Sequence, residues 1–167
     1  MNRIRKRFLG TLVLLTTILS GIASSAPTAY SSLQGVSALD VAYDFRLTDP
    51  KTAALFFRLI HETYSDRDIN QFEKSPRFVV VVNGAAVKLI AKNQPGYSAE
   101  DQEYIDEIAE RISQMAADGI RFEGCLKAAE IFGVDPGLFL GDINKIKNAW
   151  ISLAGYQAQQ FSTLPIA

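Results

Sequence analysis

The residue best suited to chemistry in this 167-residue sequence is its single cysteine, Cys125. It lies in the segment GIRFEGCLKAAEIFG (residues 119–133), where a short strand is expected to pass into a helix. A thiolate rather than a thiol is the nucleophile, and the unpaired N–H groups at the start of a helix favour negative charge. A helix beginning near Leu126 therefore makes Cys125 a candidate reactive thiol. The alternative, commoner for a lone cysteine, is a thiol that packs as a small apolar side chain.

Three other residues are candidates for assisting or opposing that thiol. Glu123 stands two residues before Cys125 on the expected strand, hence on the same face, and opposes a thiolate if it is close. Lys127 could stabilise a thiolate, but residues two apart on a helix do not face each other, so a solvated lysine is favoured. His61, the only histidine, could act as a base only if the fold brings it to the cysteine. A partly exposed helix residue is the favoured interpretation of His61.

The N-terminal residues have the three parts of a secretory signal. Basic residues at positions 3–7 are followed by an apolar run of 15 residues from Phe8 to Ile22 and by small residues at positions 23–26. The run is shorter than the roughly 18 residues of a membrane-spanning helix, which makes an uncleaved anchor the minority alternative. We therefore predict a signal peptide at 1–26, a flexible lead-in at 27–35 and one domain at 36–167. The predicted location is periplasmic or secreted, with no membrane association after cleavage.

The composition of the exported part narrows the function classes. Residues 27–167 carry 13 basic and 18 acidic side chains, a net charge of −5, with no basic stripe for nucleic acid. Their length, about 140 residues, suits one domain with a substantial core. The scattered acids and single histidine form no metal-ligand pattern, so neither a metal nor a cofactor is expected. In an oxidising compartment, an odd cysteine is a reactive thiol, an intermolecular bond or a buried thiol.

Strand and helix patterns alternate along the predicted domain. Strands are expected at 40–45, 78–82, 120–124 and 143–146, with a terminal extended segment at 161–166. Helices are expected at 50–64, 85–90, 98–119, 126–132 and 150–160. This alternation predicts an α/β sandwich with a mainly parallel sheet. Ligands of such sheets bind beyond the carboxyl ends of the strands, so Asn83-Gly84 and Gly124-Cys125 are expected to face one pocket.

Three segments resemble the DsrE/DsrF-like family, in particular its small exported members. They are VVVVNGAAVKLI at 79–90, GIRFEGCLKAA at 119–129 and NAWISLAGYQ at 148–157. The resemblance extends from Val41 to Pro165. It implies a single three-layer α/β domain with a five-stranded, largely parallel sheet, usually assembled as a homo-oligomer. In characterised sulfur-relay members, a cysteine at the position that Cys125 resembles carries a persulfide and passes the sulfur to a cysteine of a partner protein.

The resemblance therefore implies an exported sulfur carrier or sulfurtransferase-like protein with Cys125 as its catalytic residue. Asn83, Gly84 and Gly124 are the expected binding residues. Many exported relatives have His-Gly where this chain has Asn83-Gly84, and an amide, unlike histidine, does not exchange protons near neutral pH. The alternative is a non-enzymatic small-molecule-binding or oligomeric assembly module in which Cys125 is buried. A third, weaker alternative is a redox sensor that forms an intermolecular disulfide through Cys125.

Overall fold

The structure is a computed structural model that describes residues 30–167. The predicted signal peptide and residues 27–29 of the predicted lead-in lie outside the described residues. Within the remainder of that lead-in, residues Ser31–Leu33 form a short 3-10 turn, η1. No helix between residues 30 and 167 is both long and apolar enough to cross a membrane.

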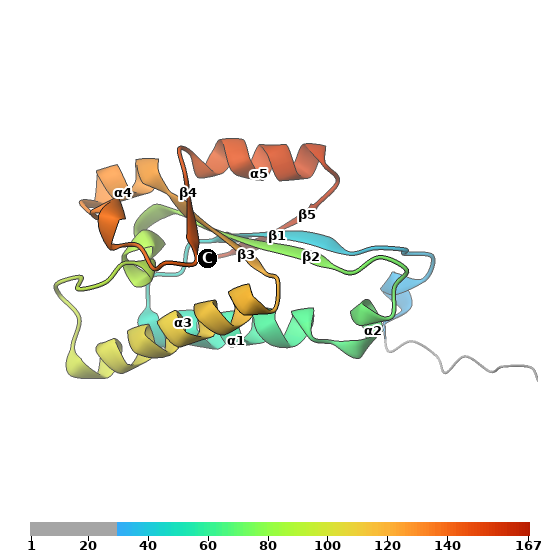
Figure 1. Cartoon of the computed structure of the whole chain (residues 1–167), viewed down its shortest axis with the longest axis horizontal. Coiled ribbons are helices and arrows are strands. Elements are labelled where there is room, and N and C mark those ends of the chain that lie inside the picture. Colours follow the sequence, from blue (N-terminus) through green and yellow to red (C-terminus); the bar gives the residue numbers. More distant parts are fainter. Residues whose placement is uncertain (1–29) are drawn as a thin grey trace, which may run out of the picture.

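Five strands form one sheet in the order β4-β3-β2-β1-β5, and every neighbouring pair is parallel (Figure 1). The strands are β1 (Asp40–Phe45), β2 (Arg77–Val82), β3 (Arg121–Cys125), β4 (Ile143–Ile146) and β5 (Ser162–Ile166). The predicted α/β class and five-stranded, mainly parallel sheet are therefore confirmed, and the described sheet is parallel throughout. The terminal extended segment proves to be a full edge strand, because it pairs with β1.

Helices cover both faces of the sheet. Helices α1 (Pro50–Tyr64) and α3 (Ala99–Ala117) lie on one side, and α4 (Leu126–Phe132) and α5 (Ala149–Ala158) lie on the other (Figure 1). The short elements are α2 (Arg67–Asn70) and the 3-10 helices η2 (Gly84–Ile90) and η3 (Pro136–Leu138). The polar stretch after α1 starts α2, because the Asp66 carboxylate accepts a hydrogen bond from the Asp68 N–H.

Side-chain caps fix the starts of the two long helices. The Asp49 carboxylate accepts a hydrogen bond of 2.8 Å from the Thr52 N–H at the start of α1, where Pro50 occupies the first helical position. Ser98 and Asp101 form a reciprocal capping box at the start of α3. Both signals are local in sequence, which is why the start of each helix could be predicted from the sequence.

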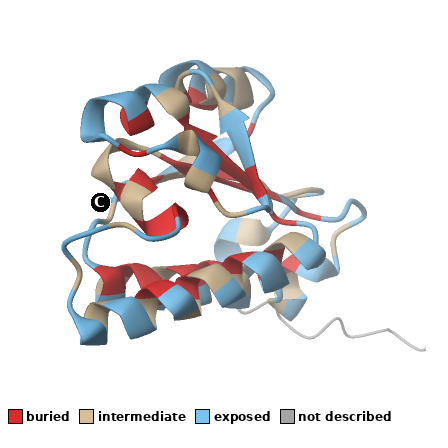
Figure 2. Ribbon diagram, turned by 60° about the vertical axis from the view of Figure 1, so that its left-hand side comes forward, coloured by how far each residue is buried: buried red, intermediate tan, exposed pale blue. Residues whose placement is uncertain are grey.

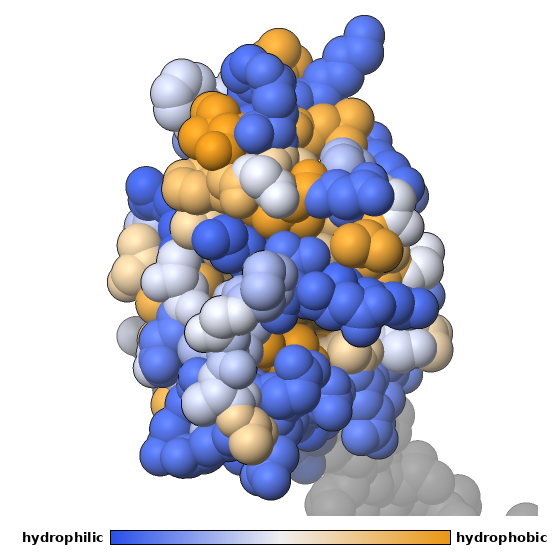
Figure 3. All heavy atoms as spheres, turned by 90° about the vertical axis from the view of Figure 1, so that its left-hand side faces the viewer, coloured by the Kyte–Doolittle hydropathy of each residue, from blue (hydrophilic) through white to orange (hydrophobic). Residues whose placement is uncertain are grey.

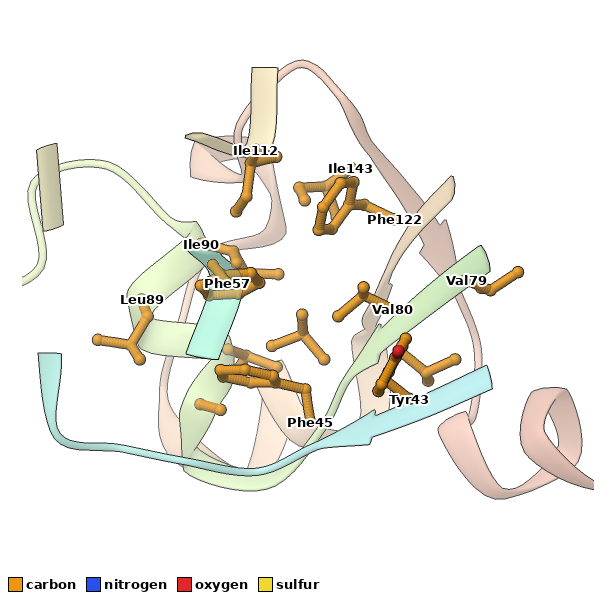
Figure 4. Packing of buried hydrophobic residues seen from close by; sticks show 14 of the residues in the cluster. Tyr43, Phe45, Phe57, Val79, Val80, Leu89, Ile90, Ile112, Phe122 and Ile143 are labelled. Atoms are coloured by element: carbon orange, nitrogen blue, oxygen red, sulfur yellow. The ribbon is translucent and has the colours of Figure 1, made fainter. Parts of the chain in front are cut away.

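The core lies mainly between the sheet and the α1–α3 layer. Phe45 of β1 stacks on Phe57 of α1 with 4.4 Å between ring centroids, and Phe122 of β3 packs beside them (Figure 4). Figure 2 shows buried residues along the strands and on the helix faces turned toward them. The other face of β1 is buried only in part: Ala42 is fully buried, whereas Asp40 and Asp44 are partly exposed.

Candidate functional site

Cys125 joins two elements, because it is the last residue of β3 and the N-cap of α4. Its Sγ accepts a hydrogen bond of 3.4 Å from the Ala128 N–H in the first turn of α4. It also accepts one of 3.3 Å from the N–H of Ala149, the first residue of α5. The starts of two helices therefore converge on one sulfur atom. The first donor follows from the predicted helix at Leu126, whereas the second was not predicted because it lies 24 residues away in the chain.

The sulfur borders a cavity at the carboxyl ends of the strands. Cys125 is only 3% exposed, and the cavity that it lines has a volume of about 320 Å³. The lining residues are Arg46, Asn83, Gly84, Cys125, Lys127, Ala128, Ile131, Phe132, Asn148 and Trp150. The structure thus brings Asn83-Gly84 and Cys125 to one cavity, as the parallel topology predicts. Trp150, Ile131, Phe132 and Asn148 were not predicted as site residues.

Gly124 does not line this cavity. Side chains alternate across a strand, so Gly124 and Cys125 face opposite sides of the sheet. A Cβ atom at Gly124 would lie 2.7 Å from Phe139 Cε2 and 2.8 Å from Ile143 Cγ2. The expectation that Gly124 binds a ligand beside Cys125 is therefore corrected: a glycine here permits close packing on the opposite face.

Two asparagines, Asn83 and Asn148, line the cavity. Asn83 Oδ1 accepts a hydrogen bond of 2.7 Å from the Gly84 N–H, and Asn148 Oδ1 accepts one of 2.9 Å from the Trp150 N–H. Within residues 30–167, neither Nδ2 group donates to another protein atom. Gly84 adopts a φ of 60°, a left-handed conformation that favours glycine. Both amides are therefore available to a bound group.

The charged residues of the cavity are basic, but each has an acidic neighbour. Arg46 Nε lies 3.4 Å from Asp44 Oδ2, and Lys127 Nζ lies 2.8 Å from Glu130 Oε2. No acidic side chain of the described chain lines the cavity itself. Lys127 was expected to be a solvated lysine, and its ion pair lies at the exposed surface. The lining therefore favours neutral or negative ligands over cations.

A polar cluster surrounds the buried carboxylate of Glu123, which stands two residues before Cys125 on β3. The carboxylate of Glu123 accepts hydrogen bonds of 2.8 Å from Arg121 Nε and from the Tyr156 hydroxyl, and a third from the Ser152 hydroxyl. Burial, followed by the hydrogen bond with Glu123, raises the pKa of Tyr156 to about 12. Since Ser152 and Tyr156 belong to α5, the cluster fastens α5 to β3.

This cluster changes the interpretation of Glu123. The sequence places it correctly on the same face as Cys125, but its negative charge is paired with Arg121 rather than left beside the sulfur. Hydrogen bonding to Glu123 raises the pKa of Arg121 above its ordinary value, so the guanidinium stays charged. The signal available in the sequence was the spacing of Ser152 and Tyr156, which places two polar side chains on one helix face.

His61 takes no part in the site. Its Nε2 lies 2.6 Å from Asp118 Oδ2, and it belongs to α1, on the opposite side of the sheet from α5 (Figure 1). The favoured interpretation of His61 as a helix residue therefore agrees with the structure. Residues 30–167 also contain no group of three or more metal-ligating side chains.

Comparisons with known proteins support the fold. No protein-family model matches the chain, and no curated protein matches its sequence. The solved structure of MTH1491 from Methanobacterium thermoautotrophicum matches with a TM-score of 0.59 at 14% identity, covering 76% of this chain and 98% of that one. The structure of BT1422 from Bacteroides thetaiotaomicron matches with a TM-score of 0.51 at 22% identity, covering 78% and 95%. Both are described as proteins of unknown function, so the similarity concerns architecture alone.

Proposed function

We propose that this protein is an exported DsrE/DsrF-like sulfur carrier that holds sulfane sulfur as a persulfide on Cys125. The observation that carries the proposal is the position of Cys125 Sγ, which borders a cavity and accepts hydrogen bonds from two backbone N–H groups. Such donors stabilise negative charge on sulfur, and a thiolate is the attacking species in exchange at a sulfur–sulfur bond. The motifs in residues 79–90 and 119–129 support the family assignment.

The chemistry requires one cysteine. The Cys125 thiolate attacks the sulfane sulfur of a donor, the sulfur–sulfur bond of the donor breaks, and its electron pair leaves with the remainder of the donor. The product is a Cys125 persulfide, whose outer sulfur can be passed to the thiol of a partner protein. A dithiol oxidoreductase would need a second cysteine, which this chain lacks.

The test is the intact mass of the protein without residues 1–26 after incubation with polysulfide or thiosulfate. We expect a gain of one sulfur atom in the wild type and none in Cys125→Ser, which removes the only thiol. The rate of alkylation by iodoacetamide, measured against pH on the folded protein, should show a thiol that reacts without unfolding. A thiol that gains no sulfur and resists alkylation until the protein unfolds would contradict the proposal.

The burial of Cys125 favours a second candidate, a binding or assembly module with a structural cysteine. Only 3% of the residue is exposed, and a buried cysteine can serve as a small apolar side chain. In that case, alkylation follows unfolding, and Cys125→Ser lowers stability without abolishing ligand binding. A homo-oligomer is proposed for either function, and sedimentation analysis of the protein without residues 1–26 would establish its mass.

A further inference from the structure

The cavity at Cys125 has an apolar wall beside its polar one. Ile131 and Phe132 of α4 and Trp150 of α5 line it, although 66%, 40% and 75% of their respective surfaces are exposed. Figure 3 faces the carboxyl ends of the strands and shows apolar side chains gathered mainly in its upper half, on the α4–α5 side. Exposed apolar groups around a concave site indicate a binding surface. A donor that uses this wall must itself have an apolar part.

Besides the paired cations Arg46 and Lys127, the polar wall has two uncharged hydrogen-bond donors. Asn83 and Asn148 line the same cavity as Cys125, their Nδ2 groups have no acceptor among residues 30–167, and no acidic lining residue competes for them. Amide N–H groups stabilise negative charge that forms on a sulfur atom. They are therefore suited to the thiolate that departs when a sulfur–sulfur bond breaks beside Cys125.

Size and solvation argue against a small inorganic donor. The volume of about 320 Å³ lies at the lower end of the range of small-molecule sites, which is roughly 300–1,000 Å³. Arg46 and Lys127 could attract the thiosulfate dianion, but each already has an acidic neighbour. Thiosulfate also has no apolar part, so it would lose solvation at Cys125 and leave the side chains of Phe132 and Trp150 in water. An organic group of moderate size covers those side chains and gains their burial.

We infer that the donor is a small organic persulfide, R–S–SH, whose R group is apolar and packs against Phe132 and Trp150. This inference rests on the proposed function and specifies its donor. The Cys125 thiolate attacks the outer sulfur of R–S–SH. A bond forms between Cys125 Sγ and that outer sulfur, and the sulfur–sulfur bond of the donor breaks. Its electron pair leaves on R–S⁻, and the proton stays on the outer sulfur of the new Cys125–S–SH. No external oxidant or reductant is required.

The test compares two donors with the same reactive group, benzyl persulfide and hydroxyethyl persulfide. The rate of sulfur loading on Cys125 is followed by intact mass in the wild type, Trp150→Ala and Ile151→Ala. Ile151 is the matched control, because it is 72% exposed and adjacent on α5 but does not line the cavity. We expect the wild type and Ile151→Ala to load about tenfold faster from benzyl persulfide, and Trp150→Ala to lose most of that preference.

The outcomes distinguish a wrong donor assignment from a wrong carrier function. Equal rates with both persulfides, or equal preferences in Trp150→Ala and Ile151→Ala, would overturn the donor assignment while sulfur loading still supported the carrier function. Loading from thiosulfate or from a protein-bound persulfide, but from neither organic persulfide, would have the same meaning. The absence of sulfur on Cys125 with every donor would overturn the carrier function and the donor assignment with it.

Discussion

Cys125, the proposed thiolate, and Glu123, a carboxylate, lie on the same face of β3. A carboxylate near a thiolate disfavours it, so their proximity requires an explanation. The explanation lies in the partners of Glu123: one oxygen is bound by Arg121 and Tyr156, and the other by Ser152. The negative charge is therefore paired within the cluster, while Sγ keeps its own two N–H donors.

The residue-scale prediction concerns Glu123 as a positioning residue. Glu123→Gln removes the charge that pairs with Arg121 and replaces an acceptor atom with a donor. We expect the free energy of unfolding, measured in urea, to fall by about 2–3 kcal/mol. Because the cluster holds α5 and hence the Ala149 N–H at Sγ, sulfur loading on the folded variant should also slow.

The control for this prediction is Glu130→Gln. Glu130 forms an exposed ion pair with Lys127, and such pairs contribute about 1 kcal/mol or less. Equal losses of stability in the two variants would contradict a stabilising role for the cluster around Glu123. An unchanged loading rate in folded Glu123→Gln would limit Glu123 to a structural role.

At the scale of elements, the junction of β3 and α4 determines which residues reach the cavity. Because a strand alternates its side chains, Cys125 faces α5 and the cavity while Gly124 faces the opposite side of the sheet. Alternation also explains why two adjacent residues of the predicted site have different roles. Gly124 allows Phe139, Ile143 and Ile90 to approach the strand closely.

The element-scale prediction is that Gly124→Ala destabilises the fold. Its Cβ would lie 2.7 Å from Phe139, 2.8 Å from Ile143 and 3.0 Å from Ile90, so these side chains or the strand must shift. Overpacking of this kind costs about 1–3 kcal/mol, measurable by thermal or urea unfolding. Gly141→Ala is the control, since a Cβ there meets no atom within 4 Å and should change stability by about 1 kcal/mol at most. Similar losses in both variants would indicate a general cost of replacing glycine.

At the scale of the whole molecule, the two ends of the sheet serve different purposes. The carboxyl ends carry the cavity and Cys125, whereas an ion pair joins the first residues of β1 and β2 at the opposite end. There Arg77 Nε donates a hydrogen bond of 3.0 Å to Asp40 Oδ1, and this contact lowers the pKa of Asp40 below its ordinary value. Stability at one end can therefore be changed without altering the chemistry at the other.

We expect the Asp40–Arg77 pair to contribute to the loss of stability of the protein in acid. A carboxylate whose pKa is lower in the folded state contributes stability above its unfolded value of about 3.9, and this contribution is lost as the pH falls through the lowered value. Urea unfolding from about pH 7 to about pH 2 should therefore show a shallower loss of stability in Asp40→Asn than in the wild type. The effect should be modest because Arg77 is more than half exposed.

The control for acid stability is Asp142→Asn, at an exposed aspartate with no ion pair among the described residues. It should keep the wild-type pH dependence. Asp40→Asn should load sulfur on Cys125 at the wild-type rate near neutral pH, because Asp40 lies at the other end of the sheet. If the stability of Asp40→Asn fell with pH as steeply as that of the wild type, the proposed role of the Asp40–Arg77 pair would be contradicted.

The features that depend on neighbouring residues could be predicted from the sequence. Asp49 and Pro50 mark the start of α1, the run 78–82 marks a buried central strand, and Cys125 before Leu126 marks the start of α4. Periodicity and capping are local, so they can be read without knowing the packing. The bounds of β3 were predicted one residue too early. The strand covers residues 121–125 rather than 120–124, which makes Cys125 its last residue.

The contacts that distant residues make around Cys125 could not be predicted from the sequence. The Ala149 N–H at Sγ, the bonds from Ser152 and Tyr156 to Glu123, and the apolar wall with Trp150 all join residues far apart in the chain. They depend on where α5 crosses the sheet, which is set by packing of whole elements rather than by local preference. A sequence pattern identifies the face of an element, whereas only the packed structure shows which side chain of another element lies against it.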